Sequence, residues 1–557
     1  MDTGHISAIS ETGSAANSGI PGRRHFLLMA GAAIGAGTLA PSSVSAGRGA
    51  AASTGSSAAL ADRTRGALSR QIWSPRQRPR GPAVADWDAL RRKLSTHHLV
   101  RPGQSGYGNA RQLYDPRFDN LMPAGIAYCG TPGDVAACLS FVTRFSLPVR
   151  ARSGGHSYAG WSSVSGGVIV DVSPLHSLRV GAGTVQVGTG LALIDFYSGL
   201  AARGVAVPGG TCPTVGIAGL TLGGGVGVVS RQFGLTSDNL AAVQIVTADG
   251  SALTCDRSRH SDLFWACQGG GGGNFGVATS FTFRTHPLPR LVLFNLSWPW
   301  SQAAHVVSGW QSWAPDAPDA IWSTLRLTAA PGGSPGISVS GAYVGTLSAA
   351  TAQLDHLLAG VGSAPRSSAV HEDTYLNAML HQAGCGTFSV AQCHTQPGGR
   401  LARVPSYAKS DYFATKLTAA GIQTLLTGIA SLGGVQGTAG GSGAISFDAL
   451  GGAVNRVPAG ATAFVHRKSL FSAQYRTVWK DPGSPQGIAN QHAWLRSVYA
   501  SLHPLANGEA YQNYVDPDLT NWRQAYYGAN YPRLSQVKAT YDPHMLFRFP
   551  QAITAAR

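Results

Sequence analysis

The sequence predicts an α+β protein of two domains, preceded by a leader outside the fold. Three observations predict this class. Short β-like runs alternate with helical segments and glycine-rich turns over residues 86–287. Residues 288–500 mix strand-like and helical runs and contain no glycine-rich nucleotide loop. Residues 501–557 are dense in aromatic side chains, so we expect them to pack back onto the first domain.

Composition and charge agree with a protein that buries a large core. The chain has 557 residues, of which 44% are hydrophobic and 12% charged, so disorder is not expected. The formal net charge is +16, but residues 1–101 contribute half of it and the rest is thinly spread. Since no dense basic run or basic helix with interleaved aromatic residues occurs, we expect no nucleic-acid partner.

Residues 1–46 predict an export signal. Arg23 and Arg24 precede an apolar stretch at 26–39, and the segment ends on the small residues Val-Ser-Ala. A membrane anchor is the alternative, but the stretch falls short of the ~20 apolar residues that a span requires. We therefore expect a twin-arginine signal, a flexible leader in 47–85, no membrane span, and a secreted or periplasmic protein.

Hydrophobic periodicity predicts individual elements of both domains. The clearest runs predict strands at 168–170, 242–246, 338–344 and 461–466, and helices at 348–358 and 410–426. No internal repeat is found at a period of 20–50 residues.

The chain has seven cysteines, an odd number for a protein of an oxidising compartment, so at least one is unpaired or otherwise occupied. Cys385 and Cys393 lie eight residues apart in a Gly-containing stretch, and we expect these two to form a disulfide. Because no CxxC pair or HExxH cluster occurs, we expect no metal site.

A glycine turn with a histidine is the first motif that carries chemistry. Arg-Ser-Gly-Gly-His-Ser at 152–157 follows the apolar run 147–149. Two glycines in a strand-end turn let backbone N–H groups approach a diphosphate, and Arg152 adds positive charge. An imidazole at this place, that of His156, could attack the 8-methyl carbon of an oxidised flavin. A histidine that merely caps the loop is the alternative.

A cysteine among glycines is the second motif. Cys212 lies within residues 209–227, which contain eight glycines, and a third glycine loop follows at 269–276. A lone buried thiol is usually inert core. This density of glycine, however, indicates close approach of the backbone to a large ligand.

Together these motifs resemble the FAD-linked oxidases of the vanillyl-alcohol-oxidase superfamily, and specifically the berberine-bridge-enzyme-like family. The resemblance covers roughly residues 110–557. It rests on RSGGHS at 152–157, CPTVG at 212–216, GGGGNFGV at 270–277, YQNYVDPDL at 511–519, YYGANY at 526–531 and LFRFPQAI at 546–553. One departure is Leu220, where many relatives carry a histidine, and we expect it to alter packing near the flavin rather than cofactor attachment.

The resemblance implies a PCMH-type FAD-binding domain in residues 86–287, completed by 501–557. It also implies a substrate domain in residues 288–500 with an antiparallel sheet covered by helices. FAD would be bound covalently twice, through His156 to the 8-methyl carbon and through Cys212 to ring carbon 6. Further cofactor contacts are expected at Arg152, Ser153, Gly154, Gly155, Ser157, Val215, Gly216, Gly224, Gly225, Gly227, Asn274, Gly276 and Asn513.

The resemblance also implies a tyrosine as catalytic base, at Tyr514, with Tyr511 beside the substrate. A free phenol has a pKa near 10, so such a base needs help from a cation or from hydrogen bonds. The alternative is that both tyrosines only pack at an interface. Asp448 resembles a residue of the family's cleft-lining strand and could bind sugar hydroxyls or assist the base. The alternative is that Asp448 is a solvent-exposed residue at the end of a strand.

We therefore expect oxidation of a C–OH group of a small molecule, with a carbohydrate as the favoured substrate. Molecular oxygen would take the electrons and leave as hydrogen peroxide, because Val215 resembles the oxidases of the family, whereas Leu or Ile would resemble its dehydrogenases. Three alternatives stay open: a tailoring oxidase of a glycosylated or polycyclic secondary metabolite, a catalytically silent flavin-binding protein, and an electron-transferring dehydrogenase.

Overall fold

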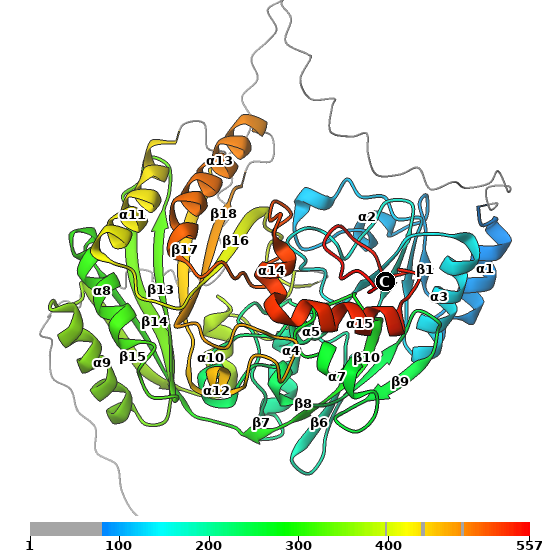
Figure 1. Ribbon diagram of the computed structural model, residues 1–557, viewed down its shortest axis with the longest axis horizontal. Coiled ribbons are helices and arrows are strands. Elements are labelled where there is room, and N and C mark those ends of the chain that lie inside the picture. The colour runs from blue at the N-terminus through cyan, green and yellow to red at the C-terminus, as the bar shows by residue number, and fades with distance from the viewer. Residues whose placement is uncertain (1–80, 396–397, 436–439, 481–483) are drawn as a thin grey trace, which may run out of the picture.

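The computed structural model describes residues 81–395, 398–435, 440–480 and 484–557, so the expected export signal and most of the expected leader lie outside the described residues. Two regions, each built on its own β-sheets, lie side by side (Figure 1). Helices and strands are mixed in both, and the predicted α+β class is confirmed. Helix α1 (Val84–Lys93) is the first described element.

The first region begins with a four-stranded sheet in the order β1-β2-β4-β3. Its strands are β1 (Leu99–Val100), β2 (Gly125–Tyr128), β4 (Val168–Asp171) and β3 (Val149–Arg152). The strands β2, β4 and β3 are parallel, and β1 is an antiparallel edge. Helix α3 (Pro132–Phe145) begins at a capping box in which Thr131 accepts from the amide of Asp134. It packs with α1 in one core, where the rings of Trp87 and Phe141 lie 4.7 Å apart.

A five-stranded antiparallel sheet completes the first region. In order across the sheet its strands are β5 (Leu178–Val180), β6 (Thr184–Gly188), β10 (Val277–Arg284), β8 (Leu240–Val246) and β9 (Ala252–Cys255). The short elements beside it are α4 (Leu193–Ala201), α5 (Ile217–Leu222), α6 (Ser230–Phe233), α7 (Ser261–Ala266), and the strand pair β7 (Val205–Ala206) and β11 (His286–Pro287).

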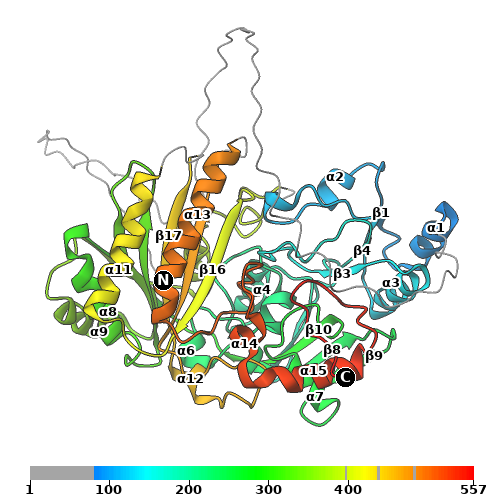
Figure 2. The same cartoon turned by 45° about the horizontal axis from the view of Figure 1, so that its top comes forward.

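The second region is a seven-stranded antiparallel sheet. In order its strands are β15 (Ser367–Asp373), β12 (Leu291–Trp298), β14 (Gly336–Val344), β13 (Ile321–Ala329), β17 (Ser442–Ala449), β18 (Phe471–Val478) and β16 (Ser406–Phe413). One face carries α8 (Ala303–Trp313), α9 (Leu347–Val361), α11 (Ala419–Ala430) and α13 (Pro485–Leu502), as Figures 1 and 2 show. Two shorter helices, α10 (Tyr375–Gln382) and α12 (Gly452–Arg456), belong to its connections.

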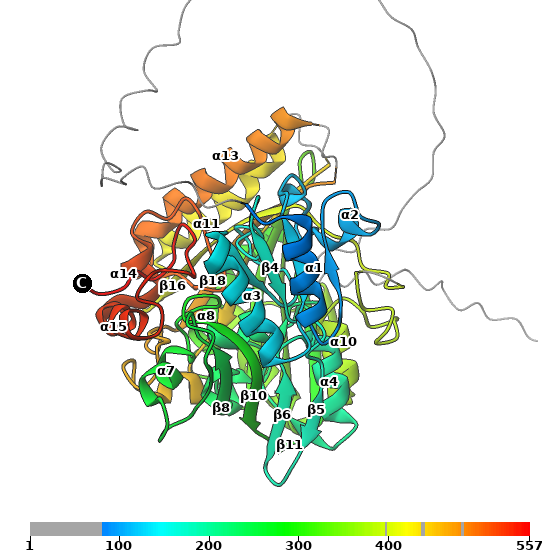
Figure 3. The same cartoon turned by 90° about the vertical axis from the view of Figure 1, so that its right-hand side faces the viewer.

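The C-terminal segment returns to the first region. Its helices α14 (Trp522–Tyr527) and α15 (Tyr531–Tyr541) share a core with the five-stranded sheet, and α15 lies beside α7 (Figure 3). A fully buried ion pair, Lys538 with Asp542 at 2.6 Å, holds the last turn of α15. Lys538 also donates to the carbonyl groups of Asn274 and Phe547, so this pair ties the C-terminal segment to the third glycine loop.

Two of the elements predicted from periodicity differ from the structure. Residues 461–466 form a buried loop rather than a strand, because the amides of Ala463 and Phe464 bond to the carbonyls of Trp265 and Gln268 instead of to a neighbouring strand. The predicted helix at 410–426 is split, since its first residues belong to β16 and α11 starts only after Thr418, whose side chain caps it. The other strands and the helix at 348–358 are confirmed.

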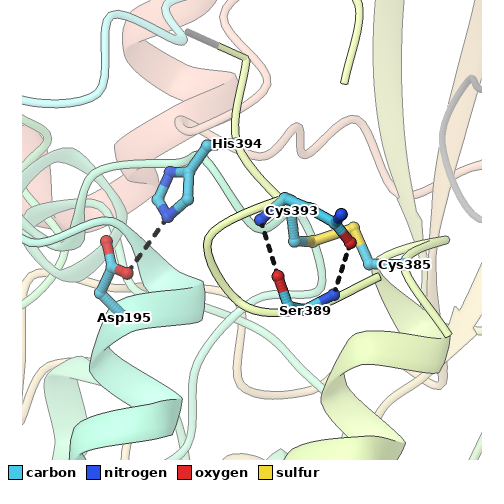
Figure 4. Close-up of a disulfide and its surroundings, with 6 residues drawn as sticks. Asp195, Cys385, Ser389, Cys393 and His394 are labelled. Atoms are coloured by element: carbon cyan, nitrogen blue, oxygen red, sulfur yellow. Dashed lines mark hydrogen bonds and ion pairs between the residues drawn. A yellow bond between two sulfur atoms is a disulfide. The ribbon is translucent and has the colours of Figure 1, made fainter. Parts of the chain in front are cut away.

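The expected disulfide between Cys385 and Cys393 is present and closes a short loop after α10 (Figure 4). Beside it, His394 lies 3.1 Å from Asp195 of α4, so the loop is tied to the first region (Figure 4). Among the described helices, none combines the length and the apolarity needed to cross a membrane.

Candidate cofactor and substrate site

A cavity of about 450 Å³ lies where the two regions and the C-terminal segment meet. The first region contributes its glycine loops, the second the uncovered face of its sheet, and the C-terminal segment the residues around Tyr514. Of the site residues predicted from sequence, the cavity is lined by Arg152, Ser153, Gly154, Gly155, His156, Ser157, Cys212, Val215, Gly216, Asn274, Gly276, Asp448, Tyr511, Asn513 and Tyr514.

His156 and Cys212 meet at this cavity although 56 residues separate them in sequence. His156 stands in the turn after β3, and Cys212 precedes α5. The Cys212 Sγ lies 4.0 Å from His156 Nδ1, while His156 Nε2 is 2.8 Å from the hydroxyl of Thr214. The ring of Tyr114 stacks on the imidazole with centroids 4.0 Å apart, which fixes the plane of the imidazole.

The surroundings set the protonation of both groups. Burial, together with the charge of Arg476, lowers the pKa of His156 to about 3, so its imidazole is neutral and nucleophilic at ordinary pH. Burial raises the pKa of Cys212, although Arg476 and hydrogen bonds from the 214–215 backbone oppose the shift. The thiol is therefore protonated before a ligand enters.

Two glycines explain how the first two loops lie in contact. A Cβ at Gly154 would come within 2.3 Å of the backbone nitrogen of Gly216, and a Cβ at Gly216 would come within 2.1 Å of Ser153 Oγ. Ser153 in turn donates to the carbonyl of Thr189 at 2.7 Å. Only glycine permits this approach of one backbone to the other.

Gly224, Gly225 and Gly227 are not among the residues that line the cavity, unlike the prediction from sequence. A Cβ at these positions would meet Phe464, Thr236 and the carbonyl of Gly209, respectively. Their neighbours are thus protein atoms, and these three glycines serve packing outside the cavity.

Arg152 does not offer a free charge. Its guanidinium forms a buried salt bridge with Asp171 at 2.5 Å, so the positive charge that the sequence predicted for a phosphate group is already paired. Ser157 accepts a hydrogen bond from the amide of Trp161. Both residues shape the turn that carries His156.

Asn274 joins the third glycine loop to the C-terminal segment. Its side-chain amide donates to the carbonyl of Gly270 at 3.0 Å, and its side-chain oxygen accepts from the amide of Ile553 at 2.9 Å. Gly276 lies against β8, where a Cβ would come within 2.5 Å of the carbonyl of Val246. The loop is therefore held at both of its ends.

The two tyrosines differ in how their hydroxyls are held. Tyr511 is buried, and its oxygen accepts from the amide of Gly225 at 2.9 Å and from Asn513 Nδ2 at 3.0 Å. Tyr514 packs on Tyr158 with ring centroids 5.6 Å apart. In the described part of the chain, no side chain or backbone group is hydrogen-bonded to the Tyr514 hydroxyl, so it is available to a ligand.

Both tyrosines keep their protons in this arrangement. Burial raises the pKa of Tyr514 well above its usual range, the neighbouring Tyr158, Asp448 and Tyr511 raise it further, and Arg476 opposes the shift. Burial also raises the pKa of Tyr511 despite the two N–H donors. Arg476 is thus the positive charge that favours a Tyr514 phenolate.

Asp448 faces the cavity from β17 and is not a solvent-exposed strand end. The hydroxyl of Thr324 on β13 donates to its carboxylate. Burial raises the pKa of Asp448, and the Thr324 bond and Arg326 partly offset this rise. The carboxyl group can therefore share or accept protons near Tyr514.

Several cavity residues were not predicted from the sequence. They are Tyr114, Tyr158, Gln474, Arg326 and Arg476. Tyr158 directly follows the 152–157 motif, and Gln474 donates to its hydroxyl at 2.9 Å. The alternation of polar and apolar residues in 471–478 marks a strand with one uncovered face and is the signal that could have found Gln474 and Arg476.

The remaining thiols lie away from the cavity. Cys129 and Cys138 are buried with their sulfur atoms 3.8 Å apart, and Cys255 lies beside Cys267. Cys212 is therefore the one free thiol without a cysteine neighbour in the described residues. Away from the cavity, His371, Asp373 and His381 form the one described group that could hold a metal ion, with donor atoms within 4.8 Å of one another.

Known proteins share both the motifs and the fold. A family described as "FAD binding domain" matches residues 123–256, and one described as "Berberine and berberine like" matches residues 510–554. YgaK of Bacillus subtilis, named as an uncharacterized FAD-linked oxidoreductase, is 32% identical over 83% of this chain and 98% of its own. A chitooligosaccharide oxidase of Gibberella zeae is 30% identical over 77% of this chain and 87% of its own.

Solved structures agree with this likeness. The BBE-like 1 protein of Physcomitrella patens has a TM-score of 0.75 at 29% identity and covers 84% of this chain and 99% of its own. The fold and the cavity thus define an FAD-linked oxidoreductase with a PCMH-type FAD-binding domain. Within that class, the chain belongs to the berberine-bridge-enzyme-like family.

Proposed function

We propose that this protein is an exported oxidase that removes hydride from a C–OH group of a carbohydrate and passes the electrons to oxygen. FAD is bound through both His156 and Cys212. The observation that supports the proposal is that these two nucleophiles line one cavity with Cys212 Sγ 4.0 Å from His156 Nδ1. Residues 86–287 and 501–557 bind the FAD, residues 288–500 bind the substrate, and residues 1–46 direct export.

The residues at the cavity fit the group. The 8-methyl group is attached to the same flavin ring that contains carbon 6, so two anchors this close can bond to one molecule. Each bond would replace one hydrogen on the imidazole nitrogen or the sulfur and one hydrogen on the flavin carbon. Oxygen would take up these two hydrogens and leave as hydrogen peroxide. The neutral imidazole of His156 supports its role as nucleophile. Two attachments also keep the cofactor in place without a closing lid.

The attachment is tested by unfolding the purified yellow protein in acid or detergent. The flavin is expected to stay with the polypeptide, and peptide mass spectrometry is expected to find it on two peptides. Cys212→Ala should stay yellow through His156 with a shifted spectrum, whereas the matched variant Cys138→Ala, which changes a thiol outside the cavity, should keep the wild-type spectrum. Release of all flavin as free FAD would refute double attachment.

Tyr514 is the proposed base. Among the described residues its hydroxyl has no hydrogen-bond partner, and the charges of Asp448 and Arg476 act on it, whereas the hydroxyl of Tyr511 accepts from two N–H groups. When bound, the flavin supplies the acceptor for hydride, and Tyr514 takes the proton of the substrate hydroxyl. Tyr514→Phe should slow anaerobic flavin bleaching by roughly 100-fold or more, the scale of a general base. An unchanged rate would transfer the role to Tyr511 or Asp448.

The names of relatives favour a carbohydrate, since a chitooligosaccharide oxidase and a xylooligosaccharide oxidase are among them. Val215 lines the cavity three residues after Cys212, and its small side chain supports oxygen as the acceptor. Val215→Leu is expected to slow reoxidation by oxygen in stopped-flow mixing while substrate reduction stays nearly unchanged. A wild type that reoxidises equally slowly would be a dehydrogenase.

A further inference from the structure

The face of the seven-stranded sheet that lines the cavity carries two arginines. Along β13 and β18, the side chains of Leu325 and Tyr475 lie in the core under the helices, so the alternate residues lie on the opposite face. Arg326 and Arg476 occupy that opposite face and line the cavity. The alternation of side chains along each strand therefore places both arginines on the face of the sheet that lines the cavity.

Buried cations elsewhere in the described residues are held by carboxylates or, in the case of Arg231, by the carbonyl groups of Leu450 and Ala317. Arg152 lies 2.5 Å from Asp171, Arg467 lies 2.6 Å from Asp238, Lys409 lies 2.7 Å from Asp516, and Lys538 lies 2.6 Å from Asp542. This pattern agrees with the high cost of removing an isolated charge from water.

Arg326 and Arg476, which are half-buried, differ from these cations. In the described ranges neither guanidinium forms a salt bridge, and the buried Nε of Arg476 has no hydrogen-bond partner. Burial lowers the pKa of Arg326, and the like charge of Arg476 lowers it further. The nearby carboxyl group, Asp448, accepts a hydrogen bond from Thr324 and forms no salt bridge with Arg326, although its charge opposes the fall in the pKa of Arg326. Two like charges that face one cavity leave it with excess positive charge, which an anion would neutralise.

The pair stands on the sheet of the second region, whereas the glycine turn expected to approach the cofactor diphosphate belongs to the first region. Arg476 is close enough to His156, Cys212 and Tyr514 to act on the ionisation of all three. It therefore lies near the proposed attachment points and the proposed base. A group bound there would belong to the substrate.

We propose that Arg326 and Arg476 bind a carboxylate or sulfate group of the substrate, so that the enzyme acts on acidic saccharides in preference to neutral ones. This inference rests on the proposed function and narrows its substrate class. The planar donor fork of arginine suits a flat carboxylate or a sulfate, and a pair of forks can hold the group from two sides. The rest of the saccharide would contact the polar side chains of the same sheet face, such as Gln474.

The test compares substrates that differ only in charge. Anaerobic flavin reduction by the holoenzyme is measured with digalacturonate and with its neutral methyl ester, and then with glucose 6-sulfate and glucose to distinguish sulfate from carboxylate recognition. We expect kcat/KM to be at least tenfold higher for an acidic member than for its neutral partner. Arg326→Gln should lower that ratio at least tenfold, while Arg326→Lys keeps part of it. Arg290→Gln, at a residue that is 78% exposed, should leave the ratio unchanged.

A second measurement does not depend on turnover. D-Glucarate, which has no hemiacetal carbon, should perturb the flavin absorbance of the wild type, whereas neutral sorbitol should not, and Arg326→Gln should weaken the glucarate effect. Equal reduction by acidic and neutral saccharides would overturn this inference and leave the proposed oxidase intact. If no saccharide reduces the flavin, the proposed carbohydrate oxidation fails, and the glucarate titration still decides whether the cations bind an anion. The inference would also be overturned by two results together. Arg476→Gln would change the reduction potential of the flavin, and Arg326→Gln would leave the ratio of kcat/KM for acidic over neutral substrates unchanged. Both arginines would then act on the cofactor.

Discussion

The buried pair Lys538–Asp542 is expected to hold the third glycine loop of the cavity, and Lys538→Met tests this. Both side chains are fully buried, and Lys538 Nζ donates to Asp542 at 2.6 Å and to the carbonyls of Asn274 at 2.5 Å and Phe547 at 2.8 Å. Met fills a similar volume, so the change mainly removes the charge and three hydrogen bonds. Asp542 is then left buried without its cation, a change that costs about 3–5 kcal/mol.

At roughly 2 °C per kcal/mol for a region of this size, we expect the melting temperature to fall by about 6–10 °C. Because the carbonyl of Asn274 also loses its partner, the fraction of protein that carries flavin should fall in parallel. Calorimetry and the ratio of visible to ultraviolet absorbance measure the two effects. Lys468→Met, at an exposed lysine, is the control.

A double-mutant cycle with Asp542→Asn separates the ion pair from simple loss of packing. Either single change leaves one buried charge unpaired, whereas the double variant leaves none, so its loss should be smaller than the sum of the two by about 2 kcal/mol or more. Additive losses, or a Lys538→Met protein that melts within a degree or two of the wild type, would show that the pair does not hold the loop.

Three further changes probe other parts of the structure. Gly154→Ala would place a Cβ within 2.3 Å of the backbone of the opposite loop, so flavin incorporation should be lost, while Gly108→Ala, outside the cavity and with no atom within 4 Å, should incorporate flavin normally; equal incorporation would contradict the packing argument. Cys385→Ser should cost roughly 2–3 kcal/mol under oxidising conditions and nothing after reduction, as measured by thermal melting. A hydrogen bond to Asp195 raises the pKa of His394, so the contribution of that pair is complete below ~6.5 and is lost as the pH rises through the raised value. His394→Gln should therefore lower stability by less than about 1 kcal/mol at low pH, since both groups are partly exposed, and by nothing near pH 9; a difference that grows with pH would refute this sign.

Elements with strong periodicity could be predicted from the sequence, and elements that depend on distant backbone partners could not. The strand that covers 338–344 alternates between buried and less buried residues over 336–341, and the helix at 348–358 has a regular apolar stripe. The apolar run 461–466 looks like a strand, but its amides bond to the end of α7, some 200 residues earlier in the chain. Local pattern carries no information about that partner, and tertiary contacts decide the conformation.

The same distinction applies to the site. His156 and Cys212 could be found because each stands in a glycine-rich turn that only a close ligand or a close backbone explains. Gly224, Gly225 and Gly227 belong to the same run, yet the atoms that exclude a Cβ at these positions come from protein. The sequence indicates that other atoms approach such a glycine closely, but it does not indicate whether these atoms belong to a ligand or to the protein.

Arg326 and Arg476 illustrate the opposite case, in which the proposed substrate recognition lies on residues without a motif. Each occupies one position of an alternating strand, and nothing local tells whether that face meets solvent, helices or a cavity. The seven-stranded sheet decides this, because its helices cover one face only. A change at such a position alters the charge of the cavity without disturbing the core on the other face, so one fold and one cofactor site can serve neutral or acidic substrates. Substrate preference in this protein should therefore follow the cavity-facing residues of β13, β17 and β18, and motifs shared across the family should not report it.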